Sequence, residues 1–255
     1  MSRSGRVAII TGGATGIGRA TCLELARRGV GEIHIGYSRS AEAAVQLSAE
    51  LADLGATGHP LQFDVSDREA VQRGAEEVLA ASGGVDVLVN CAGTTQRIDF
   101  ADLDAITPEL WDDILGVNLL GAFWVCQAFA ESLKERGGSV VNVTSISATR
   151  VVGSSLPYGV SKAALAQMTR ALAVALAPAV RVNAVAPGTV ISGWHERLIG
   201  EAAATRNFEA EAEFVPLGRL ADSEEIGRAI VTVALDLTFV TGQEVIVDGG
   251  KALRY

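Results

Sequence analysis

The sequence predicts an α/β fold in which a parallel sheet is covered on both faces by helices. Short β-branched runs alternate with amphipathic segments along the whole chain of 255 residues. The runs are apolar throughout, which is typical of strands buried on both faces of a parallel sheet. Glycine and polar motifs follow the ends of these runs, where ligands bind in such sheets.

This pattern predicts seven strands and six helical segments. The strands are expected at residues 7–10, 33–37, 61–63, 85–89, 140–143, 180–185 and 245–247. The helices are expected at residues 18–28, 41–54, 67–81, 108–136, 158–176 and 223–235. No linker, internal repeat or low-complexity tract divides the chain, so we expect one domain over residues 1–255.

Composition and charge argue against several classes of protein. The formal net charge of -9 disfavours a nucleic-acid-binding surface, which needs clustered Lys and Arg. The apolar stretch 163–180 is interrupted by polar residues and a proline, which favours a buried helix over a membrane span. The chain begins with no signal segment, and three cysteines are too few for a disulfide framework. We therefore expect a cytoplasmic protein with a small-molecule substrate and no nucleic-acid or membrane partner.

The three histidines do not predict a metal site. His34, His59 and His195 are widely separated in the sequence and lack the spacing of zinc ligands. We expect no bound metal. A substrate contact remains an alternative for His195, because it follows the sixth strand.

A glycine-rich turn leads from the first strand into the first helix. Glycines let the backbone turn tightly and approach a pyrophosphate, and the helix N-terminus offers free N–H groups. The residues of this turn that are predicted to bind a dinucleotide are Gly12, Ala14, Thr15, Gly16, Ile17 and Gly18.

The segment after the second strand predicts the choice of coenzyme. A NAD-binding chain is expected to carry an acidic residue about 20 residues beyond the glycine motif. This chain has Ser38, Arg39 and Ser40 there instead, and these donors would attract a 2′-phosphate. The cofactor is therefore expected to be NADP. NAD remains the alternative if Arg39 is only a solvated residue at the start of a helix.

Residues after three further strands complete a predicted cofactor path. Asp64 would accept a hydrogen bond from the adenine amino group, Val65 would pack on the ring, and Ser192 would reach the phosphates. Small residues after the fourth and sixth strands would let the backbone pass close to the nicotinamide. The positions are Asp64, Val65, Asn90, Ala92, Gly93, Pro187, Gly188, Val190 and Ser192. Each also fits ordinary turn chemistry.

Four residues are candidates for catalysis. Tyr158 and Lys162 are one turn apart if 158–176 is helical, so the ammonium would favour the phenolate. Tyrosine with such help can serve as a general acid or base. Ser145 would hold a carbonyl or alcohol oxygen beside it, and Asn118 would carry a proton relay through water. The alternative for the Tyr-Lys pair alone is a chance arrangement on a surface helix.

The combined motifs resemble the short-chain dehydrogenase/reductase family, and they extend over nearly the whole chain. They are TGGATGIG at 11–18, NCAG at 90–93, Asn118, Ser145, YxxxK at 158–162 and PG at 187–188. Within the family the chain is most similar to the 3-oxoacyl-(acyl-carrier-protein) reductase group. The segments that carry this likeness are 37–44, 181–188 and 241–250.

The resemblance implies a single Rossmann-type domain with seven parallel strands that transfers a hydride between nicotinamide and a carbonyl carbon. Tyr158 would be the general acid in reduction or the base in oxidation. Lys162 would lower its pKa and bind the nicotinamide ribose, Ser145 would orient the substrate oxygen, and Asn118 would position a relay water. Relatives are commonly homotetramers, so a homotetramer or homodimer built through the long helices is expected.

The substrate region is expected to be a lid at about 189–216. Its excess of acids argues mildly against an acidic acyl-carrier protein, although a solvated helical face explains the charges equally. Trp194, with Val151, Val152 and Leu156, predicts an apolar pocket for a ketone or secondary alcohol. The alternatives to this oxidoreductase are a 3-oxoacyl-thioester reductase and a non-catalytic nucleotide-binding redox sensor.

Overall fold

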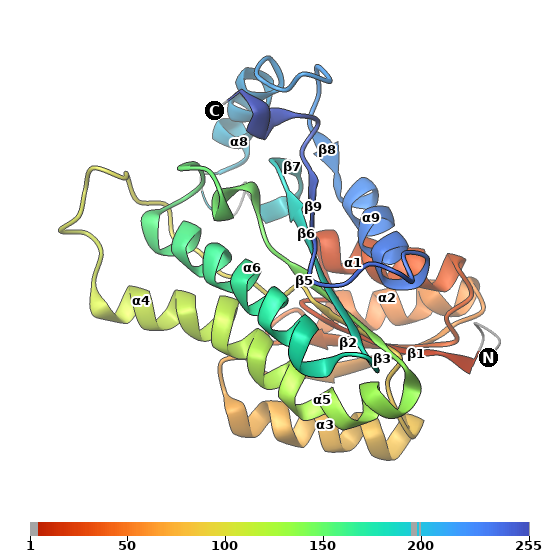
Figure 1. Cartoon of the computed structure of the whole chain (residues 1–255). Coiled ribbons are helices and arrows are strands. Elements are labelled where there is room, and N and C mark those ends of the chain that lie inside the picture. The colour runs from red at the N-terminus through yellow and green to blue at the C-terminus, as the bar shows by residue number, and fades with distance from the viewer. Residues whose placement is uncertain (1–4, 195–197, 199, 255) are drawn as a thin grey trace.

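The computed structural model describes residues 5–194, 198 and 200–254 (Figure 1). A parallel sheet of seven strands lies at its centre with helices on both faces, which confirms the predicted α/β class. Strands from both ends of the chain share this sheet, which supports the single domain proposed for residues 1–255.

The elements agree with most of the predicted ranges. The strands of the central sheet are β1 (Val7–Thr11), β2 (Glu32–Tyr37), β3 (Thr57–Gln62), β4 (Val87–Asn90), β5 (Ser139–Val143), β6 (Arg181–Pro187) and β9 (Glu244–Val247). The helices are α1 (Gly16–Arg27), α2 (Ala41–Asp53), α3 (Arg68–Ser82), α4 (Pro108–Leu115), α5 (Ala122–Arg136), α6 (Leu156–Leu176), α8 (Glu201–Ala212) and α9 (Ser223–Leu235). A small second sheet pairs β7 (Val190–Ile191) with β8 (Ala221–Asp222).

The strand order places the site. The order is β3-β2-β1-β4-β5-β6-β9, so the chain first builds outward from β1 and then returns to add β4 on its other side. Connections diverge at such a switch point, and a crevice opens at the carboxyl ends of the two strands. Thr11 at the end of β1 pairs with Asn90 at the end of β4. The glycine turn and the loop after β4 therefore start side by side.

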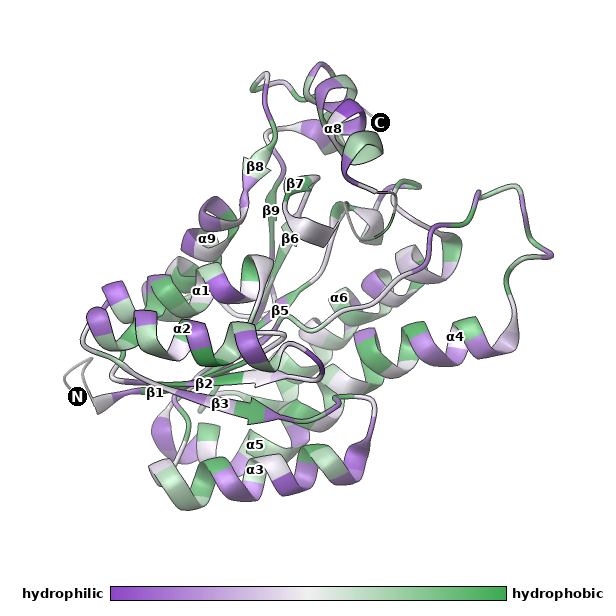
Figure 2. Cartoon of the chain, turned by 180° about the vertical axis from the view of Figure 1, so that it is seen from behind, coloured by the Kyte–Doolittle hydropathy of each residue, from purple (hydrophilic) through white to green (hydrophobic). Residues whose placement is uncertain are grey.

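Two apolar clusters fill the space between the sheet and its helices. Ile9 and Ile10 are both fully buried, but Ile10 packs with α1, α2 and α9, whereas Ile9 packs with α3, α5 and α6. Successive strand residues point to opposite faces, so both faces of the strands must be apolar. The helices, in contrast, carry hydrophobic and hydrophilic stripes (Figure 2).

Strand β3 begins earlier than predicted. The sequence favoured residues 61–63, whereas the strand spans Thr57–Gln62. Its first residues do not form a β-branched run, and Pro60 lies among them. A proline is tolerated because β3 is the edge strand of the sheet, where one side of the backbone needs no ladder partner.

The long helix predicted at 108–136 is interrupted. A π-helical turn, Gly116–Gly121, separates α4 from α5. Such turns are frequent at functional sites because they displace backbone groups from the regular helical ladder. A Cβ on Gly121 would lie 2.8 Å from a Val65 side-chain atom, so this turn passes directly against the loop after β3.

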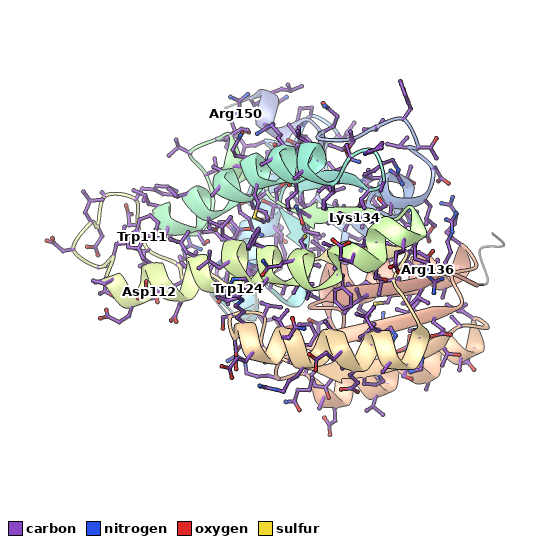
Figure 3. All side chains as sticks on the ribbon, turned by 60° about the horizontal axis from the view of Figure 1, so that its bottom comes forward. Trp111, Asp112, Trp124, Lys134, Arg136 and Arg150 are labelled. Carbon is purple, nitrogen blue, oxygen red and sulfur yellow. The ribbon has the colours of Figure 1, made fainter. Side chains whose placement is uncertain are left out.

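Among the described residues, the whole helical stretch Pro108–Arg136 is long and apolar enough, by length and composition alone, to cross a membrane. The core helix of an α/β protein meets the same test. Phe129 and Leu133 are buried beneath the sheet, in the cluster that also includes residues of α3 and α6. Trp111 and Trp124 lie on this stretch, which runs alongside α6 (Figure 3).

Candidate active site

The predicted catalytic residues come together at the carboxyl ends of β4 and β5. The Lys162 Nζ atom lies 5.7 Å from the centre of the Tyr158 ring. The Ser145 hydroxyl lies near enough to the Tyr158 phenol to lower its pKa. Asn118 joins the group through its Nδ2 atom, which donates to Ser161 Oγ at 3.0 Å on the same helix as Tyr158.

Helix α6 presents the tyrosine and the lysine on one face, as the spacing predicts. Pro157 lies in its first turn, where a proline costs no helical hydrogen bond. Lys162 is only 4% exposed, and its Nζ donates to the Val143 carbonyl at 2.8 Å at the end of β5. This hydrogen bond orients the ammonium toward the site, although it does not replace the solvation lost on burial.

The pKa of Tyr158 moves in the direction opposite to the prediction. Burial raises it above the ordinary value, and this outweighs the lowering by the nearby Ser145 hydroxyl. Burial also lowers the pKa of Lys162 to about 8. The spacing in the sequence predicted a cation beside the phenol, but it could not predict the burial of the two side chains. Tyr158 is therefore a neutral phenol at neutral pH.

Asn118 is held within the π-helical turn by the loop after β4. Its two amide hydrogens go to the Thr94 carbonyl at 3.0 Å and to Ser161, and its Oδ1 accepts from the Thr94 N–H at 2.8 Å. The side chain therefore positions this loop against α6, a role that the sequence did not reveal. The predicted proton relay through water stays a prediction.

Ser145 is fixed by the short 3-10 helix that follows it. Its Oγ accepts the Ser147 N–H at 3.1 Å as the N-cap of Ile146–Ala148. A Cβ on Gly153 would lie 2.6 Å from Ser147 Oγ, and its φ of 111° also favours glycine. Backbone from residue 153 therefore packs closely against this serine pair beside Tyr158.

The glycine turn forms a cradle that side chains would fill. Gly12 has a φ of 64°, and a Cβ on it would lie 3.0 Å from backbone atoms of Ala92. A Cβ on Gly18 would lie 2.1 Å from the Gly12 carbonyl oxygen, so only glycine allows α1 to approach this turn. These observations fit a pyrophosphate bound against the backbone.

The N-terminus of α1 also fits an anionic group. Thr15 is its N-cap but makes no side-chain capping hydrogen bond, and no acidic residue lies in the first turn. Ala14 is buried in the turn, and Ile17 is half-buried in the first helical turn. Neither side chain can accept a hydrogen bond, so neither occupies the N–H groups at the start of α1. Gly16, at the helix start, has a φ of 51°.

Thr11 is a site residue that sequence reasoning missed. Its Oγ1 accepts the N–H groups of Cys91 and Ala92, each at 3.1 Å. This double hydrogen bond fixes the loop after β4, including Gly93, beside the glycine turn. The signal was its position as the last residue of the first strand, but the two N–H partners are 80 and 81 residues away.

Ser38, Arg39 and Ser40 lie between β2 and α2, as predicted. Ser40 is the N-cap of α2 without a side-chain capping bond, and Arg39 is exposed. No carboxylate of a described residue lies within 4.0 Å of the Arg39 guanidinium. By contrast, Arg19 on α1 forms an ion pair with Glu50 at 2.5 Å.

Two other predicted cofactor residues lie after β3. Asp64 is exposed, and its Oδ1 accepts the backbone N–H and the hydroxyl of Ser66 at 2.9 and 2.7 Å. Val65 is buried against the π-helical turn near Gly121. One Asp64 carboxylate oxygen is thus engaged in the turn, and Val65 forms part of the floor between β3 and α5.

The side chain of Asn90 is engaged in the core. Its Nδ2 donates to Asn142 Oδ1 at 2.9 Å, and Asn142 in turn donates to Thr169 at 2.8 Å. The amide of Asn90 is therefore turned into the core between β4 and α5, where it ties strands together. Its side chain has a structural role, and only its backbone borders the predicted cofactor path. Ala92 and Gly93, by contrast, are half-buried beside the glycine turn.

The segment after β6 packs tightly against the C-terminal strand. The Gly188 N–H donates to the Val247 carbonyl at 3.1 Å, and a Cβ on Gly188 would lie 2.8 Å from the Asp248 Cβ. Pro187 ends β6, Val190 is buried in β7, and Ser192 is half-buried beyond it. These predicted residues therefore lie on one continuous turn.

A buried ion pair next to this turn was missed from the sequence. Lys251 Nζ donates to Glu211 at 2.5 Å and to Thr189 Oγ1 at 2.7 Å, and Thr189 also donates to Glu211. Burial raises the pKa of Glu211, but the hydrogen bonds from Lys251 and Thr189 outweigh it and leave the pKa lowered. The cluster joins α8, the turn after β6 and the C-terminal segment.

The residues predicted to line a substrate pocket differ in their exposure and surroundings. An aromatic carbon of Trp194 lies 3.7 Å from where a Cβ on Gly93 would be, and Lys162 Nζ lies 3.8 Å from the same point. Val151, in contrast, is 86% exposed and does not line a covered pocket. Val152 and Leu156 are half-buried, and His195 lies outside the described residues.

His34 and His59 do not stand alone, contrary to the sequence interpretation. They are neighbours on β2 and β3, with ring centres 4.7 Å apart and an angle of 19° between the rings. With Glu32 they form a cluster that could offer ligands to a metal. A metal lies near the plane of each imidazole that binds it, whereas these rings are stacked face to face, and His34 Nε2 bonds to Ser82 at 2.8 Å. The expectation of no metal stays a prediction.

The chain belongs to the short-chain dehydrogenase/reductase family. A family model described as enoyl-(acyl carrier protein) reductase matches residues 12–252. Relatives of this kind are dehydrogenases and reductases, so the protein is an NAD(P)-dependent oxidoreductase.

Individual relatives are named for different substrates. The chain is 37% identical to a 3-oxoacyl-(acyl-carrier-protein) reductase from Thermotoga maritima, over 99% of this chain and 100% of that protein. It is 36% identical to an L-rhamnose 1-dehydrogenase (NAD(P)(+)) from Azotobacter vinelandii, over 96% of each. A gluconate 5-dehydrogenase from Burkholderia cenocepacia, solved in complex with NADP and tartrate, has a TM-score of 0.88 at 31% identity, over 100% of this chain and 99% of that one.

Proposed function

We propose that this protein is an NADP-dependent reductase of ketones, or in reverse a dehydrogenase of secondary alcohols, with Tyr158 as the general acid/base. One observation carries the proposal. Tyr158 lies beside the Ser145 hydroxyl and the buried ammonium of Lys162, all at the carboxyl edge of the sheet. A pure nucleotide sensor, the non-catalytic alternative, has no need of this combination.

Tyr158 can act as the general acid in reduction. A general acid must carry its proton before the reaction, and a phenol with a raised pKa is neutral at neutral pH. When bound, NADPH would supply the hydride to the carbonyl carbon. The phenol would then protonate the developing alkoxide, while the Ser145 hydroxyl holds the same oxygen in place. The nearby Lys162 ammonium would stabilise the phenolate that remains.

The residues around the glycine turn suit a dinucleotide, and those after β2 suit a 2′-phosphate. Gly12 and Gly18 leave room for the pyrophosphate at the N-terminus of α1. Arg39 is exposed and has no acidic partner among the described residues, so its guanidinium can bind a phosphate in bidentate fashion. NADP is therefore the proposed cofactor, and NAD is the alternative.

A 3-oxoacyl-thioester is the second candidate substrate. The likeness to 3-oxoacyl-(acyl-carrier-protein) reductases supports it, and the sugar dehydrogenases among the relatives support a smaller alcohol. Residues 189–216 are proposed as the lid over either substrate. Helix α8 within this range is held by the Lys251–Glu211 pair, which would keep the lid near the site.

A homotetramer or homodimer is proposed through the long helices. Leu120 and Phe123 in the 108–136 stretch are 43% and 38% exposed, and Val160 and Val174 on α6 are 45% and 81% exposed. Contact between copies would bury these apolar side chains.

The three cysteines are free thiols, which supports a cytoplasmic location.

The variant Tyr158→Phe tests the proposal because it removes the proton donor and preserves the ring. We expect loss of NADPH-dependent reduction across a panel of ketones, sugars and 3-oxoacyl thioesters, with NADPH binding retained. Turnover equal to that of the parent protein would refute the role of Tyr158. An absence of turnover in both, with tight NADPH binding, would favour the sensor.

A further inference from the structure

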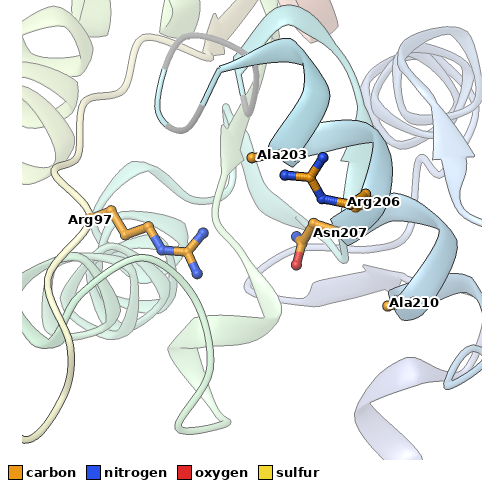
Figure 4. Close-up of a pocket in the computed structure, with 5 residues that line it drawn as sticks. All are labelled: Arg97, Ala203, Arg206, Asn207 and Ala210. Atoms are coloured by element: carbon orange, nitrogen blue, oxygen red, sulfur yellow. The ribbon is translucent and has the colours of Figure 1, made fainter.

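A cavity of about 460 Å³ lies between the loop after β4 and helix α8. The residues lining it are Arg97, Ala203, Arg206, Asn207 and Ala210 (Figure 4). Four of them, spaced i, i+3, i+4 and i+7, form one face of α8. This face includes no acidic residue, although the helix as a whole is rich in glutamate.

Two cations face each other across this cavity. The Arg97 side chain extends from its loop toward α8, and the Arg206 side chain extends from α8 toward Arg97 (Figure 4). Both are exposed, and no carboxylate of a described residue lies within 4.0 Å of either guanidinium. Like charges that converge without a counterion repel each other, and an anion placed between them removes that repulsion.

The acid on α8 that contacts a lining residue is already paired with a cation. Asn207 Nδ2 donates to Glu211 at 3.2 Å, and the same carboxylate is paired with Lys251 at 2.5 Å. Glu211 therefore adds little negative charge to the cavity. None of the glutamates of α8 is among the residues that line the cavity.

The cavity is close to the proposed reaction centre. Arg97 comes four residues after Gly93, which lies beside Lys162 and Asn118, so the connecting chain spans at most about 14 Å. The loop is also held near the start of α6. The Ile98 N–H donates to the Ser154 carbonyl at 2.8 Å, and Thr95 and Ser154 share a hydrogen bond of 2.5 Å between their hydroxyls.

We propose that Arg97 and Arg206 together bind an anionic group of the substrate, remote from the carbonyl that is reduced. This inference rests on the proposed reductase function and specifies its substrate class: an oxo acid, or the corresponding hydroxy acid, whose carboxylate is separated from the reacting carbon by a short chain. Guanidinium groups bind carboxylate through paired, charge-assisted hydrogen bonds. A phosphate ester presents the same chemistry to the two arginines.

The test compares substrates that differ only in the anion. We would measure reduction of 4-oxopentanoate, 5-oxohexanoate and 6-oxoheptanoate, of the methyl ester of each, and of phosphate monoesters of matching hydroxyketones. The variants are Arg97→Ala, Arg206→Ala and Arg206→Lys, and Arg228→Ala on α9 is the matched control. Losing one charged hydrogen-bonding partner is expected to raise KM for the anionic ketone about tenfold or more.

The expected result is specific to the anion. Each Ala variant should lose kcat/KM for an acid or a phosphate while its methyl ester is reduced within about twofold of the parent rate. Arg206→Lys should retain part of the preference, because it keeps the charge without the planar fork. A preference for acids over phosphates identifies a carboxylate site, and the reverse identifies a phosphate site.

Two results would overturn the inference. One is equal kcat/KM for acid and ester in the parent protein over all chain lengths, and the other is an equal loss for both in the Ala variants. To separate this from failure of the proposed function, binding of the same acids to Tyr158→Phe would be titrated with and without Arg97→Ala. Arginine-dependent binding in Tyr158→Phe, together with no turnover of any ketone by the parent protein, would preserve the anion site and reject only the reductase.

Discussion

Lys251 and Glu211 form an ion pair at 2.5 Å that joins the C-terminal segment to helix α8, and both side chains are largely buried. The two residues are 40 positions apart in the sequence. The pair also holds Thr189, the first residue of the proposed lid. The position of the proposed lid is therefore linked to residues near the end of the described chain, far in sequence from Tyr158.

The first prediction concerns this pair. Lys251→Met leaves the Glu211 carboxylate without its cation, so we expect the free energy of unfolding to fall by about 1 to 3 kcal/mol. Hydrogen exchange should accelerate in Glu201–Ala212 and remain unchanged in α1. Lys134→Met, which removes a solvent-exposed pair with Glu131, is the control and should change stability little. Equal exchange in α8 of the parent and Lys251→Met proteins would contradict this role.

The second prediction concerns pH. The pKa of Lys162 is lowered to about 8, so its ammonium is charged below that pH and loses its proton above it. Ketone reduction should be constant from about pH 6 to 7.5 and should decline above about pH 8. Lys162→Arg, which keeps the charge, should move the decline to higher pH whatever its absolute rate. A decline at the same pH in both proteins would show that another group titrates.

The third prediction concerns the coenzyme. Arg39→Ala removes the proposed partner of the 2′-phosphate, and a charged hydrogen bond of this kind corresponds to about a 10- to 100-fold change in affinity. Fluorescence titration should therefore show weaker NADPH binding and unchanged NADH binding. Arg73→Ala, an exposed arginine on α3, is the control. NADPH affinity that is the same in parent and Arg39→Ala would remove the reason for preferring NADP.

The fourth prediction concerns acid stability. Burial and the neighbouring His59 lower the pKa of His34 to about 4. The pKa of a histidine in the unfolded chain is about 6.5. Between these values the unfolded chain binds a proton that the folded protein does not, so stability falls as pH decreases from about 6.5 to 4. We expect this group to contribute about 1 to 3 kcal/mol of that loss. His34→Gln should show a shallower fall over this range in urea unfolding, and an identical slope would contradict the assignment.

Local features of the fold were predictable because strand and helix periodicities are read within a few residues. The strand at 7–10 and the helix at 223–235 were predicted within one residue of their observed bounds. Strand β3 and the π-helical turn were not, because an edge position and a backbone distortion depend on neighbours. The same limit explains why the stacking of His34 on His59 was missed.

The residues of the candidate site also fall into those that local spacing predicts and those placed by distant contacts. Spacing alone predicted Tyr158 and Lys162 on one face of a helix. The inward-facing amide of Asn90, the locked amide of Asn118 and the double hydrogen bond to Thr11 involve partners 24 to 81 residues away. No local pattern encodes such distances.

The sequence by itself determined the order of strands and helices, the glycine turn that can accept a pyrophosphate and the family to which the chain belongs. Those properties follow from short-range periodicity and from backbone freedom at single residues. Only the tertiary structure decided that burial raises the pKa of Tyr158 and that Arg97 faces Arg206 across a cavity. Solvation and charge pairing depend on which distant segments meet, and folding brings those segments together.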